Sequence, residues 1–274
     1  MQIRTAFLAT TILATAATAA QAQNTCAQGN TIADGVLTIA TGNPAYYPWV
    51  MDDAPESKQG FEAAVAYAVA NKMGFADDQV VWTRSSFDQA IQPGAKDFDF
   101  NLQQYSITAE RDAVVDFSLP YYSAPAAVLC SACGGEGSGV GGLSALKSLK
   151  WGAAAGTTAG GMIQELIGPD SSVLLYDDSA DVTAAMQAGQ IDASLFDLPT
   201  ALYLGAVVLD NGSVLGQFSA DLSENPDQFG LLMEEGNPLK TCVDAALTEL
   251  IDSGELAAIE AEWLQDATDV PLLK

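Results

Sequence analysis

The 274-residue sequence contains no histidine. This absence excludes a Ser-His-Asp or Cys-His catalytic arrangement and removes the commonest metal ligand. Basic residues are also scarce, with 10 Lys and Arg against 35 Asp and Glu. Because no basic face remains to neutralise phosphate groups, we expect no nucleic-acid partner. The acidity instead indicates a solvated surface.

The N-terminal residues have the features of an export signal. Arg4 is followed by an apolar stretch over residues 6–20 and by the small-x-small pattern Ala20-Gln21-Ala22. The apolar stretch is shorter than the roughly 20 residues of a membrane span. The residues before Cys26 lack the aliphatic residue of a lipoprotein signal. We therefore predict a signal peptide over residues 1–22, cleaved near Ala22, and a soluble periplasmic protein; a buried N-terminal helix is the alternative.

The chain has only four cysteines. In an exported protein, cysteines are expected to be paired in disulfides. We favour the pairs Cys26–Cys242 and Cys130–Cys133. A zinc site at Cys130 and Cys133 is the competing interpretation, but no second pair or histidine completes it. We expect no metal and no cofactor.

The remaining sequence alternates strand-like and helix-like segments from residue 36 onward, which is the pattern of an α/β protein. A glycine-rich tract over residues 134–142 interrupts the alternation, which then restarts. Residues 207–209 and 214–218 resemble strands joined by the hairpin signal Asn211-Gly212. Two α/β blocks are predicted, with boundaries near the glycine tract and near residues 218–222.

The first candidate binding residue is Arg111. Thr108 is a plausible helix N-cap, which places Arg111 at about the third helical position. A guanidinium at a helix N-terminus, where the helix dipole is already positive, would attract a carboxylate. The alternative is a surface arginine paired with Glu110 or Asp112.

Two further segments place polar groups at strand ends. The segment Gly156-Thr157-Thr158 follows a strand, so the backbone can approach a ligand while a threonine caps the next helix. Asp197 ends a buried strand, where ligands of open α/β sheets bind, and its carboxylate could receive an ammonium group. A plain strand-to-helix turn and a simple N-cap are the respective alternatives.

An aromatic, proline-rich turn covers residues 43–49, directly after the first strand. Such a turn can form a rigid ligand wall. Packing between the lobes is the alternative.

Taken in order, these motifs resemble those of the family 3 extracellular solute-binding proteins, from about Gly35 to Leu264. The resemblance implies two Rossmann-like lobes joined by two crossover strands, with lobe 1 over residues 31–129 and 219–274 and lobe 2 over residues 130–218. The cysteine pair in the loop after residue 129 would then lie at the hinge. The motifs that carry the resemblance are Gly60-Phe61-Glu62, Ser106-Ile-Thr-x-x-Arg111, Val115-Asp-Phe-Ser-x-Pro-Tyr-Tyr122, Gly156-Thr-Thr158, Ile191-Asp-Ala193 with Asp197, and Phe229-Gly230.

The same resemblance assigns roles to the candidate residues. Arg111 would hold the α-carboxylate of an amino acid, helped by donors at Ser106 and Thr158. Asp197 would receive the α-ammonium group from the opposite lobe. The wall around the ligand side chain would consist of Asn43, Tyr46, Phe87 and Gln104.

Asn43 and Gln104 depart from the usual residues of the family at these positions. An amide at Asn43, where several members have an aspartate, argues for an uncharged polar or aromatic side chain. The resemblance implies a monomer that delivers the amino acid to the membrane permease and ATPase subunits of an ABC importer, and no catalysis. The alternatives are a periplasmic dehydratase-type enzyme on the same scaffold and a ligand-sensing subunit.

Overall fold

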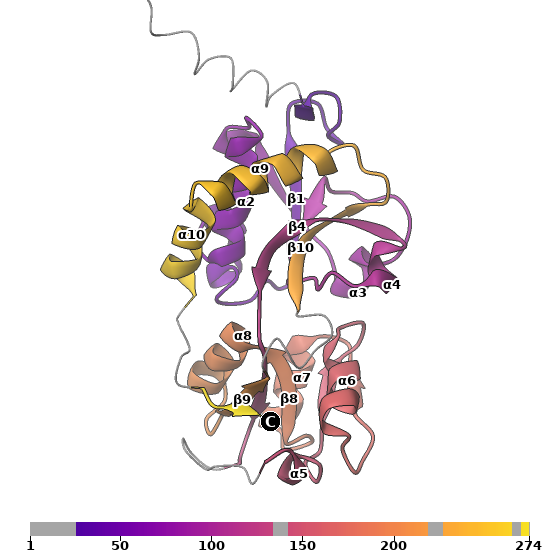
Figure 1. The fold of residues 1–274 in the computed structure, drawn as a ribbon, viewed down its shortest axis with the longest axis vertical. Coiled ribbons are helices and arrows are strands. Elements are labelled where there is room, and N and C mark those ends of the chain that lie inside the picture. Colours follow the sequence, from indigo (N-terminus) through magenta and orange to yellow (C-terminus); the bar gives the residue numbers. More distant parts are fainter. Residues whose placement is uncertain (1–25, 134–141, 219–226, 265–269, 274) are drawn as a thin grey trace, which may run out of the picture.

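The computed structural model describes residues 26–133, 142–218, 227–264 and 270–273. The predicted signal peptide and most of the glycine-rich tract lie outside the described residues. Two α/β lobes are stacked along the long axis of the molecule (Figure 1). Each has its own sheet and its own cluster of buried apolar side chains.

The first lobe is built on a five-stranded sheet with strand order β2-β1-β3-β10-β4. β1 pairs in parallel with β2 and β3, whereas β10 is antiparallel to β3 and β4. The strands of this sheet are β1 (Leu37–Thr41), β2 (Val80–Arg84), β3 (Phe100–Asn101), β4 (Val115–Ser123) and β10 (Gln228–Glu234).

The first lobe has three longer helices, α2 (Phe61–Lys72), α9 (Lys240–Asp252) and α10 (Glu255–Trp263). They contact one another and lie on one side of the sheet (Figure 1). In α9, buried Val243, Ala246, Leu247 and Leu250 follow the spacing of one helical face. The helices and 3-10 turns of this lobe are η1 (Met51–Asp53), η2 (Pro55–Ser57), α2 (Phe61–Lys72), η3 (Asp77–Gln79), α3 (Phe87–Ala90), α4 (Ala109–Asp112), α9 (Lys240–Asp252) and α10 (Glu255–Trp263).

The second lobe contains a four-stranded sheet with order β11-β9-β5-β8 and the parallel pair β6-β7. A bridge between Trp151 and Ala193 brings the β6 segment beside β8. Its strands are β5 (Ala126–Cys130), β6 (Gly152–Ala154), β7 (Leu174–Tyr176), β8 (Ala193–Asp197), β9 (Ser213–Phe218) and β11 (Leu272–Leu273). Its helices are α5 (Leu143–Leu146), α6 (Ala159–Met162), η4 (Ile163–Ile167), α7 (Ser179–Gln187), α8 (Leu198–Tyr203) and η5 (Leu204–Val208).

The chain passes between the lobes from β4 to β5 and from β9 to β10. It passes a third time between Leu264 and Val270, because α10 packs in the first lobe and β11 pairs with β9 in the second. The division inferred from the sequence therefore differs from the sheets at two points. β5 begins in the second sheet at Ala126, and residues 270–273 belong there too, because Leu273 packs into that lobe's apolar cluster.

The segment after α8 also differs from the prediction. Residues 207–209 were predicted as a strand, but the helix continues through η5 to Val208. A short apolar run such as this one fits a buried helix as well as a strand, so periodicity alone does not decide between them. Asn211 consequently lies in a turn that leads from a helix into β9, and the predicted hairpin is wrong.

Both predicted disulfides are present, Cys26–Cys242 and Cys130–Cys133. The first joins the N-terminal segment to α9 within the first lobe. The second does not lie at the hinge as expected. β5 runs from Ala126, opposite Asp197, to Cys130 four residues later, which places the disulfide about 13 Å from the cleft end of the strand.

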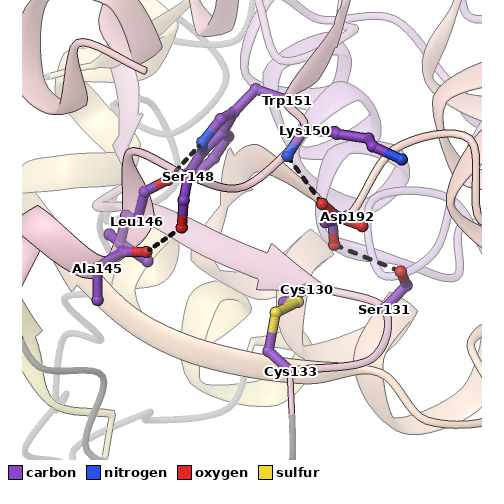
Figure 2. Close-up of a disulfide and its surroundings, with 9 residues drawn as sticks. All are labelled: Cys130, Ser131, Cys133, Ala145, Leu146, Ser148, Lys150, Trp151 and Asp192. Carbon is purple, nitrogen blue, oxygen red and sulfur yellow. Dashed lines mark hydrogen bonds between the residues drawn. A yellow bond between two sulfur atoms is a disulfide. The ribbon is translucent and has the colours of Figure 1, made fainter. Parts of the chain in front are cut away.

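Figure 2 shows the surroundings of the Cys130–Cys133 disulfide. The Ser131 hydroxyl donates to the Asp192 carbonyl, and the Lys150 amide donates to the Asp192 carboxylate at 2.8 Å. The Trp151 indole donates to the Leu146 carbonyl at 2.9 Å. The disulfide therefore tethers a loop to the core of the second lobe.

Candidate functional site

A cavity of about 410 Å³ opens between the two lobes. Both lobes contribute residues to the lining of this cavity. Those of the first lobe lie in the loops after β1 and β3 and in α3 and α4, and those of the second lobe include residues of β6, α6 and β8. All nine residues predicted from the sequence line it, namely Asn43, Tyr46, Phe87, Gln104, Ser106, Arg111, Thr157, Thr158 and Asp197.

Arg111 has the predicted local structure. Thr108 caps α4, because its hydroxyl accepts from the Arg111 amide at 3.2 Å, and Arg111 is the third residue of that helix. Its side chain is buried and lies over the Phe87 ring, 5.2 Å from the centroid. Burial lowers the pKa of the guanidinium, and the Coulombic attraction of Asp227 opposes this shift most strongly. Arg111 therefore does not form the alternative that the sequence left open, a surface ion pair with Glu110 or Asp112.

Arg111 also connects the two lobes. One terminal nitrogen donates to the Ser106 carbonyl at 2.7 Å, and the other donates to the Gly156 carbonyl of the second lobe at 2.8 Å. Gly156 has a positive φ of 71°, and a Cβ there would lie 1.9 Å from the Asp88 carboxylate. The left-handed backbone therefore favours glycine at this position, where the lobes approach each other.

The two threonines after Gly156 line the cavity, but neither caps α6 with its side chain. The Thr157 hydroxyl donates to the Ala154 carbonyl at 2.7 Å. The Thr158 hydroxyl lies close enough to Asp227 to lower the pKa of that carboxyl. The predicted capping role is therefore wrong, because no side-chain hydrogen bond caps α6.

Asp197 combines both roles considered from the sequence. Its carboxylate caps α8 by accepting from the Thr200 amide at 2.8 Å, and the same residue lines the cavity. Burial raises the pKa of this carboxyl to about 6, although the hydrogen bonds from Thr200 act in the opposite direction. The cap fixes the carboxylate at the cavity wall.

The aromatic turn over residues 43–49 is divided between the cavity and the contact between the lobes. Asn43 and Tyr46 line the cavity. Tyr47 packs against Tyr203 of the second lobe with ring centroids 4.3 Å apart. The fully buried Trp49 donates from Nε1 to the Thr200 hydroxyl at 2.8 Å. Both sequence interpretations of this turn therefore apply, each to different residues.

Gln104 is hydrogen-bonded to the buried carboxyl of Glu62. Its backbone has a positive φ of 51°, and its amide donates to Glu62 at 2.8 Å. The Gln104 side chain and the Tyr121 hydroxyl also hydrogen-bond the Glu62 carboxyl, which is 1% exposed. Burial raises the pKa of Glu62 to about 7. Glu62 thus positions the loop that leads to Ser106, and the motif Gly60-Phe61-Glu62 was its signal in the sequence.

Sequence reasoning missed four acidic residues of the cavity. Asp88 and Asp177 are exposed, whereas Asp178 and Asp227 are half-buried, and the charge of Asp227 acts on Arg111. None belongs to a motif that distinguishes it among 35 acidic residues. The cavity therefore offers one guanidinium and several carboxylates, an arrangement suited to a zwitterion or a cation. Within the described residues, no group of three or more His, Cys, Asp or Glu could hold a metal ion.

Comparison with solved structures supports the same fold. An ancestral arginine-binding protein bound to arginine is 24% identical, with a TM-score of 0.67 over 84% of this chain and 99% of that one. The Salmonella typhimurium periplasmic binding protein STM4351, described as highly specific for arginine, is 22% identical, with a TM-score of 0.67 over 84% and 99%. At these identities the likeness establishes the architecture of a type II periplasmic binding protein.

A third structure is an ancestral amino-acid-binding protein described as a precursor of cyclohexadienyl dehydratase. It is 22% identical, with a TM-score of 0.66 over 84% of this chain and 96% of that chain. No curated protein sequence matches the chain. Among the described residues, no helix has the length and apolar character needed to cross a membrane.

The model of the bacterial extracellular solute-binding proteins, family 3, matches residues 37–266. The match includes both lobes and every residue of the cavity discussed above. With the two-lobed fold and the cavity between the lobes, this match shows that the chain belongs to the family 3 bacterial extracellular solute-binding proteins.

Proposed function

We propose that this protein captures an amino acid between its lobes and delivers it to the permease and ATPase subunits of an ABC importer. The observation that carries the proposal is that Arg111 of the first lobe and Asp197 of the second line the same cavity. A guanidinium can grip the α-carboxylate, and a carboxylate can receive the α-ammonium group. Since Arg111 and Asp197 belong to different lobes, a zwitterion that binds both would stabilise the closed form.

The ligand side chain would contact Asn43, Tyr46 and Phe87, a wall of one amide and two aromatic rings. This wall favours an uncharged polar or aromatic amino acid. The carboxylates of Asp177 and Asp178 near the rim would repel an acidic side chain. Aspartate and glutamate are therefore the amino acids least compatible with this cavity.

Export to the periplasm, with cleavage near Ala22, and action as a monomer belong to the same proposal. Membership of an extracellular family supports export. N-terminal sequencing of protein from its native envelope tests the cleavage, and an intact Met1 would contradict it.

A thermal-shift screen against the twenty common L-amino acids tests the proposed function. A molecule that binds only the folded state raises the melting temperature, by an amount equivalent to about 2.7 kcal/mol at 100 times its Kd. We expect a shift with uncharged polar or aromatic amino acids and none with aspartate or glutamate. If no amino acid shifts the melting temperature and calorimetry detects no binding, the proposal is wrong.

A dehydratase-type enzyme is the second candidate. Its support is Asp197, because a carboxyl whose pKa is raised to about 6 is suited to general acid catalysis. Incubation with prephenate or arogenate separates the two functions. Product formed by the wild-type protein and lost in Asp197→Asn would favour the enzyme.

A further inference from the structure

Two consecutive glutamines of the first lobe, Gln103 and Gln104, line the cavity and are held in opposite senses. A glutamine amide carries an NH2 group that donates and a carbonyl oxygen that accepts. Gln103 uses its oxygen inside the protein, where it accepts from the Tyr105 hydroxyl. Gln104 uses its nitrogen, which donates to the Glu62 carboxyl. The pair therefore leaves one donor and one acceptor for a ligand.

A chain of buried hydrogen bonds fixes the orientation of the Gln103 amide. The Ser85 hydroxyl donates to the Ser86 carbonyl at 3.3 Å, so its oxygen accepts from Asn101 Nδ2 at 2.9 Å. The same Asn101 nitrogen also donates to the Tyr105 hydroxyl at 3.3 Å. Tyr105 directs its single proton to Gln103 Oε1 at 2.8 Å. The NH2 group of Gln103 is consequently the part that remains free.

The Glu62 carboxyl fixes Gln104 in the reverse orientation. One of its oxygens accepts from the Gln104 backbone amide at 2.8 Å and from the Tyr121 hydroxyl. Its other oxygen accepts from Gln104 Nε2. Because an ionised carboxylate only accepts hydrogen bonds, the amide must turn its nitrogen toward Glu62 and its carbonyl oxygen away.

Both free amide atoms are accessible from outside the protein. In the described part of the chain, Asn101 Oδ1 is the only buried side-chain nitrogen or oxygen without a hydrogen-bond partner. Gln103 Nε2 and Gln104 Oε1 do not belong to that class, although neither forms a hydrogen bond with the described residues. Gln103 Nε2 lies beside Gly42, where a Cβ would approach it to 3.0 Å, next to Asn43 of the cavity wall. Since both glutamines line the cavity, we assign both atoms to its wall.

We propose that Gln103 and Gln104 select a primary carboxamide side chain, that of free glutamine or asparagine. This inference rests on the proposed amino-acid site and narrows its ligand class. A carboxamide accepts from Gln103 Nε2 and donates to Gln104 Oε1. A carboxylate offers no donor to Gln104, an ammonium or guanidinium group offers no acceptor to Gln103, and an apolar ring leaves both atoms unpaired. A site built for hydrogen bonds rejects ligands that cannot form them.

The first experiment compares each carboxamide with its methyl ester. The γ-methyl ester of L-glutamate and the β-methyl ester of L-aspartate are uncharged and similar in shape, but they lack the donor. Calorimetry at about pH 8 keeps Glu62 ionised, because the pKa of this carboxyl is raised only to about 7. We expect wild-type protein to bind glutamine or asparagine at least tenfold more tightly than the corresponding ester.

Two variants separate the roles of the glutamines. Glu62→Gln keeps the shape, but its new NH2 group would donate to Gln104 Oε1 and reverse that amide. The preference for carboxamide over ester should then fall to about onefold, whereas a merely structural defect would weaken both ligands equally. Gln103→Met leaves Glu62 untouched and should weaken carboxamide and ester alike by at least tenfold, because both accept from Gln103. Gln92→Met, on the exposed surface of the same lobe, is the matched control and should bind as wild type.

Three outcomes overturn the inference while the proposed function stands. They are equal affinities of wild type for carboxamide and ester, binding confined to amino acids other than glutamine and asparagine, and wild-type affinity of Gln103→Met for the carboxamide. A preference that persists in folded Glu62→Gln overturns the role given to Gln104. If wild type binds none of the twenty common amino acids, both the inference and the proposed function fail.

Discussion

Arg111 and Asp197 bring opposite charges to the cavity from the two lobes, and the lobes hold these two side chains differently. Arg111 of the first lobe is the third residue of a four-residue helix, and one of its hydrogen bonds crosses to Gly156 of the second lobe. Asp197 of the second lobe caps its own helix through Thr200. The position of the guanidinium therefore depends on closure of the cleft, whereas the carboxylate is fixed within one lobe. We infer that lobe 2 offers a preformed half-site and that the lobe 1 half-site is completed on closure.

The disulfides give the largest expected difference between the lobes. Cys26–Cys242 of the first lobe spans 216 residues, whereas Cys130–Cys133 of the second spans three. The loop-entropy relation gives about 5 kcal/mol of stabilisation for the long loop and about 2 kcal/mol for the short one. We therefore expect Cys26→Ser/Cys242→Ser to lower the melting temperature much more than Cys130→Ser/Cys133→Ser, as measured by calorimetry.

Neither pair of cysteines lines the cavity, so both double variants should retain wild-type affinity for amino acids at a temperature where they are folded. Equal losses of stability in the two variants would show that loop length does not distinguish the lobes.

Substitution of Arg111 is the most direct test of the first half-site. Arg111→Ala removes the charge-assisted bonds to a carboxylate, so the Kd for amino acids should rise at least 100-fold, or about 3 kcal/mol. Lys150→Ala is the control, since it removes a positive charge from the surface of the second lobe, away from the cavity. Unchanged affinity of a folded Arg111→Ala protein would refute the assignment.

Substitution of Asp197 should have a smaller effect. Asp197→Asn keeps a side-chain oxygen for the Thr200 amide, because asparagine caps helices about as well as aspartate. It loses only the charge toward the ammonium group, so we expect a loss of about 30-fold, or about 2 kcal/mol. The melting temperature should stay near that of wild type. A drop of many degrees would mean that the charge is needed for the fold rather than for the ligand.

The dependence of affinity on pH should be the smallest effect. The pKa of Asp197 is raised to about 6, so this carboxyl is ionised above pH 6 and protonated below it. Since only the ionised form attracts an ammonium group, affinity should fall about tenfold from pH 7 to pH 5. Titration calorimetry at several pH values should find this component missing in Asp197→Asn. An equal dependence in the variant would assign it to another group, of which Glu62 and Asp227 are the nearest candidates.

The sequence predicted the residues of the cavity better than the boundaries of the lobes. Short motifs marked Arg111 and Thr158. The cap by Thr108 fixes the place of Arg111 in α4, whereas Thr158 lines the cavity without the predicted capping role. Asp227 carried no such signal, since its position depends on hydrogen bonds to Ala124 and through Gln228 to Ile107, which are distant in the chain. The third passage between the lobes was missed for the same reason, because a two-residue strand such as β11 is defined only by its partner β9.

The pairing of β11 with β9 places the two ends of the described chain on opposite lobes, since Cys26 is bonded to α9 in the first and Leu273 packs in the second. A donor fluorophore fused ahead of Cys26 and an acceptor fused after Lys274 would therefore move with different lobes. Energy transfer between the two fluorophores would report the opening and closing of the cleft in solution without labelling any internal position.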